Sequence, residues 1–270
     1  MANAKQPNII TNYINNIILE VRTLGISIEV STDYREFAKI RKGQLDRPPI
    51  TPLFDHTVAN LTNNNFFFIK GTDSTGRVVH LQAARHFDLT GQTLADHIYE
   101  YRHAYTLTSR DINIDESEYR MSPISKQMTG NVCYHGENWY HPDFRGTGLS
   151  TILPRLLFAV CFSRYPFLDH VFGFILSNLV YCGVLAQYGY THAQPGGIMW
   201  KQTKSDIPIT EWVTWISAED LFHLLKFKPG MECELAEPEI NKLQLVAQID
   251  QGMATEVYHR LPKPDHVLYG

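Results

Sequence analysis

The stretch Tyr140-His-Pro-Asp-Phe-Arg-Gly-Thr-Gly-Leu-Ser150 lies where a strand-like segment gives way to a long apolar helix. Its two glycines, Gly146 and Gly148, leave successive backbone N–H groups unscreened by side chains. The N-terminus of the following helix adds a partial positive charge of about 0.5 units. The stretch therefore predicts a cradle for a phosphate or pyrophosphate group. For so short a glycine motif, the alternative is a tight turn that merely starts a helix.

The residues of this stretch resemble the phosphate loop of the GNAT superfamily of acyl-CoA-dependent N-acyltransferases. That loop reads Arg/Gln-x-x-Gly-x-Gly/Ala, usually after a Val-x-Pro strand exit. Here Tyr140-His141-Pro142 stands for the exit, and Arg145, Gly148 and Ser150 stand for the loop. Ser150 departs from the family's Gly or Ala, although it is still small.

A second motif of the family opens a helix with Asn and closes it with Gly-Phe. This chain has Asn178 and Gly189-Tyr190 at the family's spacing. The family's frequent helix tyrosine, four residues before the glycine, falls on Leu185, which leaves the usual general acid unassigned. The two motifs span about residues 130–192, and we predict that this segment is the cofactor-binding core.

The resemblance implies that acyl-CoA enters a gap between the strand before the loop and the next strand. Asn178 would contact the pantetheine arm or order the backbone nearby, with a plain helix cap as the alternative. Backbone groups at the strand exit would pair with pantetheine as an added strand does, and loop N–H groups would hold the pyrophosphate. The residues so implied are Trp139, Tyr140 and His141 for pantetheine, and Arg145, Gly146, Thr147, Gly148, Leu149 and Ser150 for pyrophosphate.

Acyl transfer to an amine needs a group that accepts a proton, because only a neutral amine attacks a thioester. Strand alternation in Cys133-Tyr-His-Gly-Glu-Asn-Trp139 predicts that His135, Glu137 and Trp139 share one face. We predict Glu137 as the base, with His135 second. The alternative for Glu137 is a solvated carboxylate or one that is paired with an arginine.

The departing thiolate gains from a nearby hydroxyl donor. Ser150, Tyr181 and Tyr188 are the candidates. Tyr181 lies about one helical turn before Leu185. Tyr188 directly precedes Gly189, and the alternative for Tyr188 is a packing role in the core.

Composition excludes several other classes of protein. Of 270 residues, 44% are hydrophobic and 19% charged, which is ordinary for a globular chain. A net charge of -4 without a long basic run argues against a nucleic-acid partner. The four cysteines form no CxxC pair, and the twelve histidines form no His-Glu-x-x-His, so we expect no metal site. The polar N-terminus lacks the apolar core of a signal peptide, which favours the cytoplasm.

The segment over 171–191 carries no charge, and a membrane span needs about 20 mostly apolar residues. This segment contains several polar residues and changes character at Ser177-Asn178. We therefore predict a buried strand followed by a helix, and no membrane span.

Apolar periodicity predicts a chain that alternates between helices and strands. Helices are expected over 9–24, 33–40 with a cap at Thr32-Asp33, 94–107, 147–165, 178–188, 218–227 and 238–248. Strands are expected over 26–30, 65–70, 77–84, 130–140, 170–176, 198–202 and 211–216, with an irregular polar segment over 108–128. We predict one α/β domain over residues 1–270, with a GNAT-like mixed sheet flanked by helices and extra N- and C-terminal helical segments.

The leading function is acyl transfer, with acetyl as the first choice, from acyl-CoA to a small-molecule or peptide amine. One alternative is an N-acyl synthase that uses acyl carrier protein or long-chain acyl-CoA. Another is a GNAT-like domain that senses acyl-CoA without turnover. A Gly-x-Ser-x-Gly elbow and a nucleotide P-loop are both missing from the sequence. The acceptor, the acyl length and the oligomeric state stay open, with a homodimer as one alternative.

Overall fold

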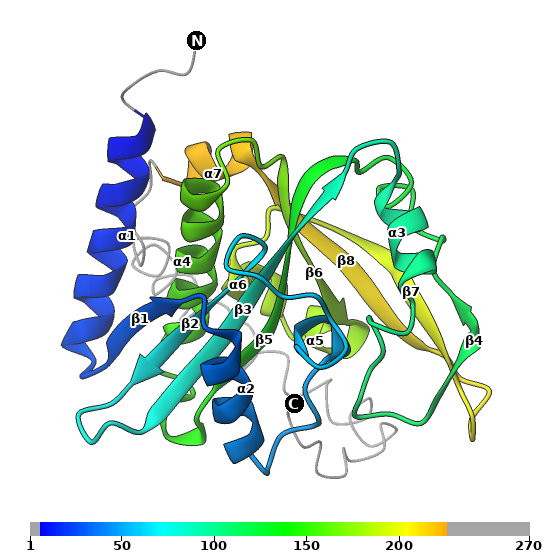
Figure 1. Ribbon diagram of the computed structural model, residues 1–270, viewed down its shortest axis with the longest axis horizontal. Coiled ribbons are helices and arrows are strands. Elements are labelled where there is room, and N and C mark those ends of the chain that lie inside the picture. The colour runs from blue at the N-terminus through cyan, green and yellow to red at the C-terminus, as the bar shows by residue number, and fades with distance from the viewer. Residues whose placement is uncertain (1–5, 226–270) are drawn as a thin grey trace, which may run out of the picture. The chain divides into compact units, whose positions relative to one another are not determined.

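A computed structural model of the chain describes residues 6–225. Its centre is one eight-stranded sheet with the order β1-β2-β3-β5-β6-β8-β7-β4 (Figure 1). Neighbouring strands pair antiparallel, except for the parallel pair β5 and β6. The strands are β1 Ser27–Ser31, β2 Phe66–Thr72, β3 Val78–Leu89, β4 Ile112–Glu118, β5 Gly130–Tyr140, β6 His170–Leu176, β7 His192–Gln202 and β8 Ile209–Ser217. The expected mixed α/β sheet is confirmed.

Helices cover both faces of this sheet. One face, called the α4 face below, packs against α1 (Gln6–Thr23), α4 (Leu149–Arg164) and α7 (Ala218–Leu224). Two short helices, α5 (Ser177–Tyr181) and α6 (Val184–Tyr188), also add apolar residues to that side. The other face, the α2 face, packs against α2 (Tyr34–Gly43), the 3-10 turn η1 (Pro52–Phe54) and α3 (Leu94–Glu100).

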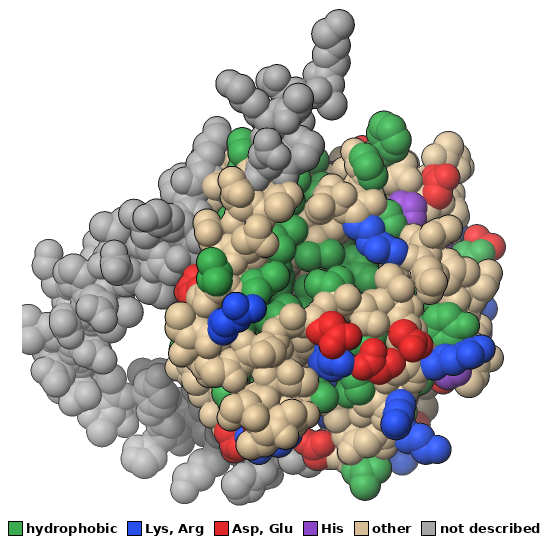
Figure 2. Space-filling model, turned by 60° about the vertical axis from the view of Figure 1, so that its left-hand side comes forward, with side chains coloured by type: hydrophobic (Ala, Val, Ile, Leu, Met, Phe, Trp, Pro, Cys, Tyr) green, Lys and Arg blue, Asp and Glu red, His purple; other side chains and the backbone are tan. Residues whose placement is uncertain are grey.

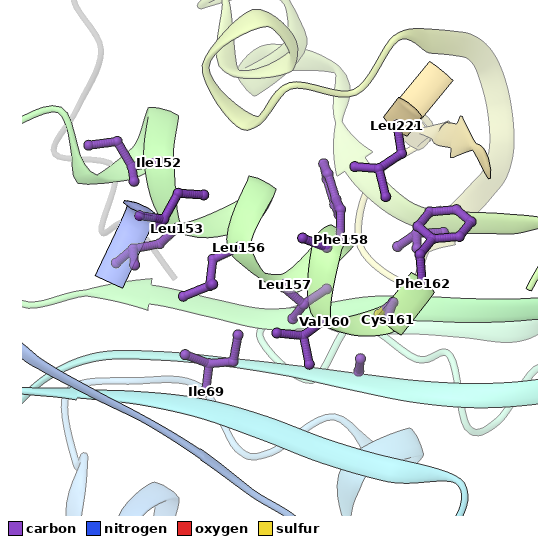
Figure 3. Packing of buried hydrophobic residues seen from close by; sticks show 14 of the residues in the cluster. Ile69, Ile152, Leu153, Leu156, Leu157, Phe158, Val160, Cys161, Phe162 and Leu221 are labelled. Atoms are coloured by element: carbon purple, nitrogen blue, oxygen red, sulfur yellow. The ribbon is translucent and has the colours of Figure 1, made fainter. Parts of the chain in front are cut away.

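The helix that follows the glycine loop is apolar almost all round, which is typical of a helix buried in a core. Figure 3 shows Leu156, Leu157 and Val160 of α4 directed toward the sheet, where Ile69 lies. Phe158 and Phe162 lie near Leu221 of α7 in the same view. Because α4 is buried along its length, its N-terminal end and the glycine loop are held in a fixed place on the sheet.

Most predicted elements agree with the structure, including the strands β2 and β3 and the cap of α2. Asp33 accepts hydrogen bonds from the backbone N–H groups of Arg35 and Glu36. The helix predicted over 94–107 is too long, because α3 ends at Glu100. Beyond it the chain turns to pair with η1, where the carbonyl of Ala104 accepts from the N–H of Leu53.

Two further predictions need correction. The segment over 108–128 is not wholly irregular, because β4 forms the edge of the sheet there; its charged sequence is typical of an edge strand. The helix predicted over 178–188 is divided into α5 and α6 by Gly183, whose φ of 81° is left-handed. The helix predicted over 238–248 lies outside the described residues, and a single domain over 1–270 therefore stays a prediction.

On the face drawn in Figure 2, Lys and Arg side chains lie close to Asp and Glu side chains, with apolar groups between them. One group of neighbouring opposite charges consists of Lys70, Glu29 and Glu36. The Lys70 ammonium pairs with Glu29 at 3.0 Å and with Glu36 at 2.6 Å. In the described part of the chain, none of the helices is both long enough and apolar enough to cross a membrane.

Candidate functional site

The parallel strands β5 and β6 part soon after they meet. Their ladder covers only residues 132–134 of β5 and 170–172 of β6, although β5 continues to Tyr140 and β6 to Leu176. On its other side, β5 carries a bulge: Leu81 faces Trp139 and Ala83 faces Gly136, so two β5 residues share one partner on β3. A bulge bends its strand and increases the local twist, which moves the end of β5 away from β6. The two strands therefore part after their ladder, as the resemblance implied, and we call the region between them the gap.

The glycine loop lies at the open end of this gap. Gly146 and Gly148 have φ angles of 76° and 82°, and a Cβ atom on either would meet nothing within 4 Å. Gly148 precedes α4 as its N-cap and has no side chain to bond the first N–H groups, which have no partner inside a helix. The loop thus presents open space in front of unscreened backbone N–H groups, and this geometry fits a pyrophosphate.

The loop is tied to α6 through two side chains. Ser150 Oγ lies 3.4 Å from Gln187 Oε1, and Arg155 donates to the backbone carbonyl of Gln187 at 3.2 Å. Arg155 also explains why a glycine stands at position 189 in the second motif. Gly189 has a φ of 79°, and a Cβ atom there would lie 2.8 Å from Arg155 Nε. A side chain at Gly189 would displace this clamp.

Asn178 lies next to the gap but does not cap a helix. The helix begins at Ser177, and Asn178 is its second residue, with an exposed side chain. Its backbone carbonyl accepts a hydrogen bond from the N–H of Cys182 at 3.1 Å. The side-chain amide of Asn178 is therefore directed at no cap position and is accessible to a ligand.

Buried polar groups line the α4 face beside the bulge. His135 Nδ1 lies 2.9 Å from the Tyr190 hydroxyl, and burial lowers the pKa of His135 to about 3, so its ring is neutral. The Tyr188 ring lies 6.5 Å from the His135 ring, and burial raises the pKa of Tyr188, so its hydroxyl keeps its proton. The buried atoms that lack a hydrogen-bond partner among the described residues include His80 Nε2, Gln82 Oε1 and His135 Nε2. Polar groups of a ligand such as pantetheine would fit them.

Glu137 lies on the opposite, α2 face in a dense ion-pair network. Its carboxylate accepts from Arg41 Nε at 2.6 Å, from Arg47 Nη2 at 3.1 Å and from the backbone N–H of Thr51 at 2.9 Å. The side chain of Glu137 is only 4% exposed. The pairing with arginine that the sequence left as an alternative is thus observed, and the role of Glu137 as a base stays a prediction.

The prediction that His135, Glu137 and Trp139 share one face is wrong for His135. Glu137 and Trp139 face the α2 side, whereas His135 packs against Phe158 of α4. The bulge is the physical reason, because one extra residue inverts the alternation of the strand.

Tyr181 is isolated from the other predicted catalytic residues. It is 79% exposed on α5, and its ring contact is with Trp212 at 6.2 Å. The structure thus brings His135 and Tyr188 together on the α4 face and leaves Glu137 and Tyr181 elsewhere.

Sequence reasoning missed Glu211, a buried carboxylate on β8. Glu211 stands opposite Leu176 at the end of β6 and is 6% exposed. Trp200 Nε1 donates to its Oε2 at 2.7 Å, and among the described residues no cation pairs with it. Burial raises the pKa of Glu211 to about 7, partly offset by the Trp200 hydrogen bond. The signal was present, since alternation places Glu211 on the same strand face as the buried Val213.

No protein-family model matches this chain, and a search of curated proteins finds no match. Among solved structures, NAA60 of Arabidopsis thaliana in complex with acetyl-CoA is similar at 9% identity and a TM-score of 0.42, over 72% of this chain and 99% of that one. Aminoglycoside acetyltransferase AAC(6')-Ib with coenzyme A and kanamycin is similar at 13% identity and a TM-score of 0.39, over 73% and 98%. A spermidine N-acetyltransferase chimera from Vibrio cholerae SpeG and hSSAT is similar at 11% identity and a TM-score of 0.38, over 73% of this chain and 98% of that one. The parted parallel pair and the glycine loop agree with the features that the resemblance in sequence implies.

Proposed function

We propose that this chain transfers an acyl group, with acetyl as the first choice, from acyl-CoA to an amine. The observation that carries the proposal is the open glycine loop at the N-terminus of α4, at the mouth of the gap between β5 and β6. Beyond Tyr134, no described strand pairs with β5 on its β6 side, so backbone groups that point to that side could pair with pantetheine amides. Of the predicted Trp139, Tyr140 and His141, the backbone of Tyr140 would take that part, and Asn178 would border the same arm. The carbonyl of Trp139 already lies 2.9 Å from His80 Nδ1, and the N–H of His141 donates to the carbonyl of Val79 at 2.8 Å.

Tyr188 is our proposed donor to the departing thiolate. It lies on the α4 face with His135, and its raised pKa means that it keeps a proton to donate at neutral pH. Tyr181 ranks behind it because its ring is largely in solvent.

Glu211 is our proposed proton acceptor, in competition with Glu137. An ammonium acceptor passes one proton to the Glu211 carboxylate, and the neutral amine nitrogen then forms a bond to the thioester carbon. The C–S bond breaks and its electron pair leaves with sulfur. Tyr188 gives its proton to that sulfur, and the second amine proton restores the Tyr188 hydroxyl. A carboxylate with a pKa near 7 suits this task, because about half of it is ionised at neutral pH and it binds a proton more tightly than an ordinary carboxylate does.

The loop is tested by Gly148→Glu, which places a carboxylate where the pyrophosphate would lie. We expect acetyl-CoA to raise the melting temperature of the parent in a concentration-dependent way and to leave the variant unshifted. Gly91→Glu is the matched control, because Gly91 also has a left-handed φ, of 83°, and open space around its Cβ. If Gly148→Glu folds and still binds acetyl-CoA like the parent, the loop is not the phosphate site.

Measuring the release of free thiol distinguishes acetyl transfer from the N-acyl synthase and the sensing domain. If acetyl-CoA releases CoA thiol in the presence of one amine from a panel of acceptors, acetyl transfer is supported. Release only from long-chain acyl-CoA or acyl carrier protein would favour the N-acyl synthase. Binding of acyl-CoA without release by any acceptor would favour a sensing domain.

A further inference from the structure

A group of buried polar side chains on the α2 face has hydrogen-bonding atoms without partners. Six such atoms lack a partner among the described residues, in side chains that are buried or half-buried. Each one costs stability unless a ligand or a water satisfies it. We call this group the Arg85 cluster, and its atoms are Arg85 Nε, His97 Nδ1 and Nε2, Tyr105 Oη, Thr106 Oγ1 and Ser125 Oγ.

Three members of the Arg85 cluster, Arg85, His97 and Tyr105, come from separate segments and converge through ring contacts. The Arg85 guanidinium carbon lies 5.0 Å from the centre of the Phe87 ring, and that ring lies 4.6 Å from the His97 ring of α3. The His97 ring in turn meets the Tyr105 ring edge-on at 6.0 Å. Ser125 is tied to the start of α3, because its backbone carbonyl accepts from the second residue of that helix at 2.7 Å.

The cluster carries one uncompensated positive charge. Arg85 donates to the backbone carbonyl of Leu53 at 2.8 Å, and no described carboxylate pairs with it. His97 adds no charge at neutral pH, because burial first and then Arg85 lower its pKa to about 4. One guanidinium surrounded by neutral hydroxyl and imidazole groups is complementary to a single carboxylate.

The cluster also lies beside the point where β5 and β6 part. Arg85 stands opposite Tyr134 in the β3–β5 ladder, and Tyr134 stands opposite Phe172 in the last pair before the gap. The Tyr105 ring lies 5.6 Å from Tyr134 and 5.9 Å from Phe174. A ligand held in the cluster therefore reaches toward the end of the gap where the acyl group would lie.

We propose that the amine acceptor also carries a carboxylate, and that the Arg85 cluster binds this carboxylate. The inference rests on the proposed acyl transfer for the identity of the ligand as an acceptor, but the carboxylate site stands on its own geometry. The acceptor would then place its anionic end at Arg85 and its amine toward Glu211. Both of these uncompensated charges belong to the α2 face.

The test compares an amino acid with its amide. L-phenylalanine and L-phenylalaninamide have the same amine and ring, and only the first has a carboxylate; L-alanine with its amide covers a smaller size. We measure binding by calorimetry, with and without acetyl-CoA. We expect at least one amino acid to bind about 10-fold or more tightly than its amide, as a charge-assisted hydrogen bond would provide.

Two conservative variants separate a ligand site from a structural group. Tyr105→Phe and Ser125→Ala each remove one unpartnered buried oxygen, so the melting temperature of the free protein should stay the same or rise. Binding of the amino acid should weaken by about 5-fold in each. Arg85→Met should abolish the preference for the acid over the amide, and Arg85→Lys should keep part of it because it keeps the charge.

Two outcomes would overturn the proposal. One is that acetyl-CoA binds but none of the amino acids does, in which case the proposed function survives and the carboxylate site does not. The other is that Tyr105→Phe and Ser125→Ala lower the melting temperature of the free protein without weakening binding, which would assign these atoms to structural water. If instead amino acids bind as expected but no acyl-CoA does, the cluster stands and the acyl transfer falls.

Discussion

Glu137 and Glu211 are two buried carboxylates on the same face of one sheet, on opposite sides of the gap between β5 and β6. Glu137 accepts hydrogen bonds from two arginines and a backbone N–H, whereas Glu211 accepts one from a neutral indole. Burying a charge is costly unless it is paired, and the two sites resolve that cost differently. Glu137 is compensated and holds structure together. Among the described residues Glu211 has no cationic partner, and burial raises the pKa of its carboxylate to about 7.

The network around Glu137 joins three segments at the bulge. Arg41 of α2 also donates to the carbonyl of Pro48 at 2.8 Å, and Arg47 lies 5.6 Å above the Trp139 ring. Glu137 itself has a φ of 57°, which is uncommon for a residue other than glycine and persists where the surroundings hold it. The bulge therefore keeps its shape, and the gap its width, through these ion pairs.

The largest effect that we expect comes from Glu137→Gln. The variant leaves Arg41 and Arg47 buried without their carboxylate, and breaking such a pair costs about 3–5 kcal/mol. Urea denaturation should show this loss in the free energy of unfolding. Glu36→Gln is the control, because the ion pair of Glu36 with Lys70 is more exposed than those of Glu137. Its loss should lower the free energy of unfolding by less than about 1 kcal/mol.

The same variant decides between the two candidate bases. If Glu211 takes the proton, the folded Glu137→Gln variant should keep the rise of kcat/KM toward about pH 7, even where the altered bulge lowers the value of kcat/KM. Loss of that rise in folded Glu137→Gln would instead restore Glu137 as the base.

The second prediction concerns Glu211→Gln and activity. The variant keeps an acceptor for the Trp200 indole but cannot take a proton, so kcat/KM should fall about 10²-fold. In the parent, kcat/KM should rise with pH until about pH 7, where Glu211 becomes ionised. The variant should lack this limb of the pH profile. Unchanged turnover with an unchanged profile would reduce Glu211 to a neutral structural acid.

The third prediction is the effect of the same variant on stability. Burial raises the pKa of Glu211 from 4.5 to about 7, so the folded state binds this proton more tightly than the unfolded state does. The stabilisation is complete below pH 4.5 and is lost as pH rises through 7, a change of about 3 kcal/mol. Glu211→Gln should therefore match the parent near pH 4.5 and exceed it by about 3 kcal/mol at pH 8. Equal stability at both pH values would show that the carboxylate is compensated after all.

The contrast between the two glutamates also shows how far sequence reasoning extends. The glycine loop, β5, β6 and α4 could be predicted because apolar periodicity and positive-φ glycines act locally. The partners of Glu137 could not, because Arg41 and Arg47 are about ninety residues away in the sequence and meet it through a bulge. One inserted residue inverted the face of His135, which alternation alone cannot foresee.

The Arg85 cluster was hidden for a related reason. Its members come from β3, α3 and the segments around residues 105 and 125, and the sequence over 108–128 gives no periodic signal. Glu211 was the more accessible clue, since a charged residue stood on the apolar face of a predicted strand.

The smallest effect that we expect comes from Trp200→Phe. This variant removes the indole N–H whose hydrogen bond lowers the pKa of Glu211, so that pKa should rise further and the acid limb of the kcat/KM profile should move to higher pH. A hydrogen bond to a charged group corresponds to about 1 pH unit of such movement. Trp212→Phe is the matched control, because Trp212 donates to Ser177 Oγ at 3.1 Å and should leave the limb in place. A limb that moved downward in Trp200→Phe, or moved equally in both variants, would mean that a group other than Glu211 sets the pH profile.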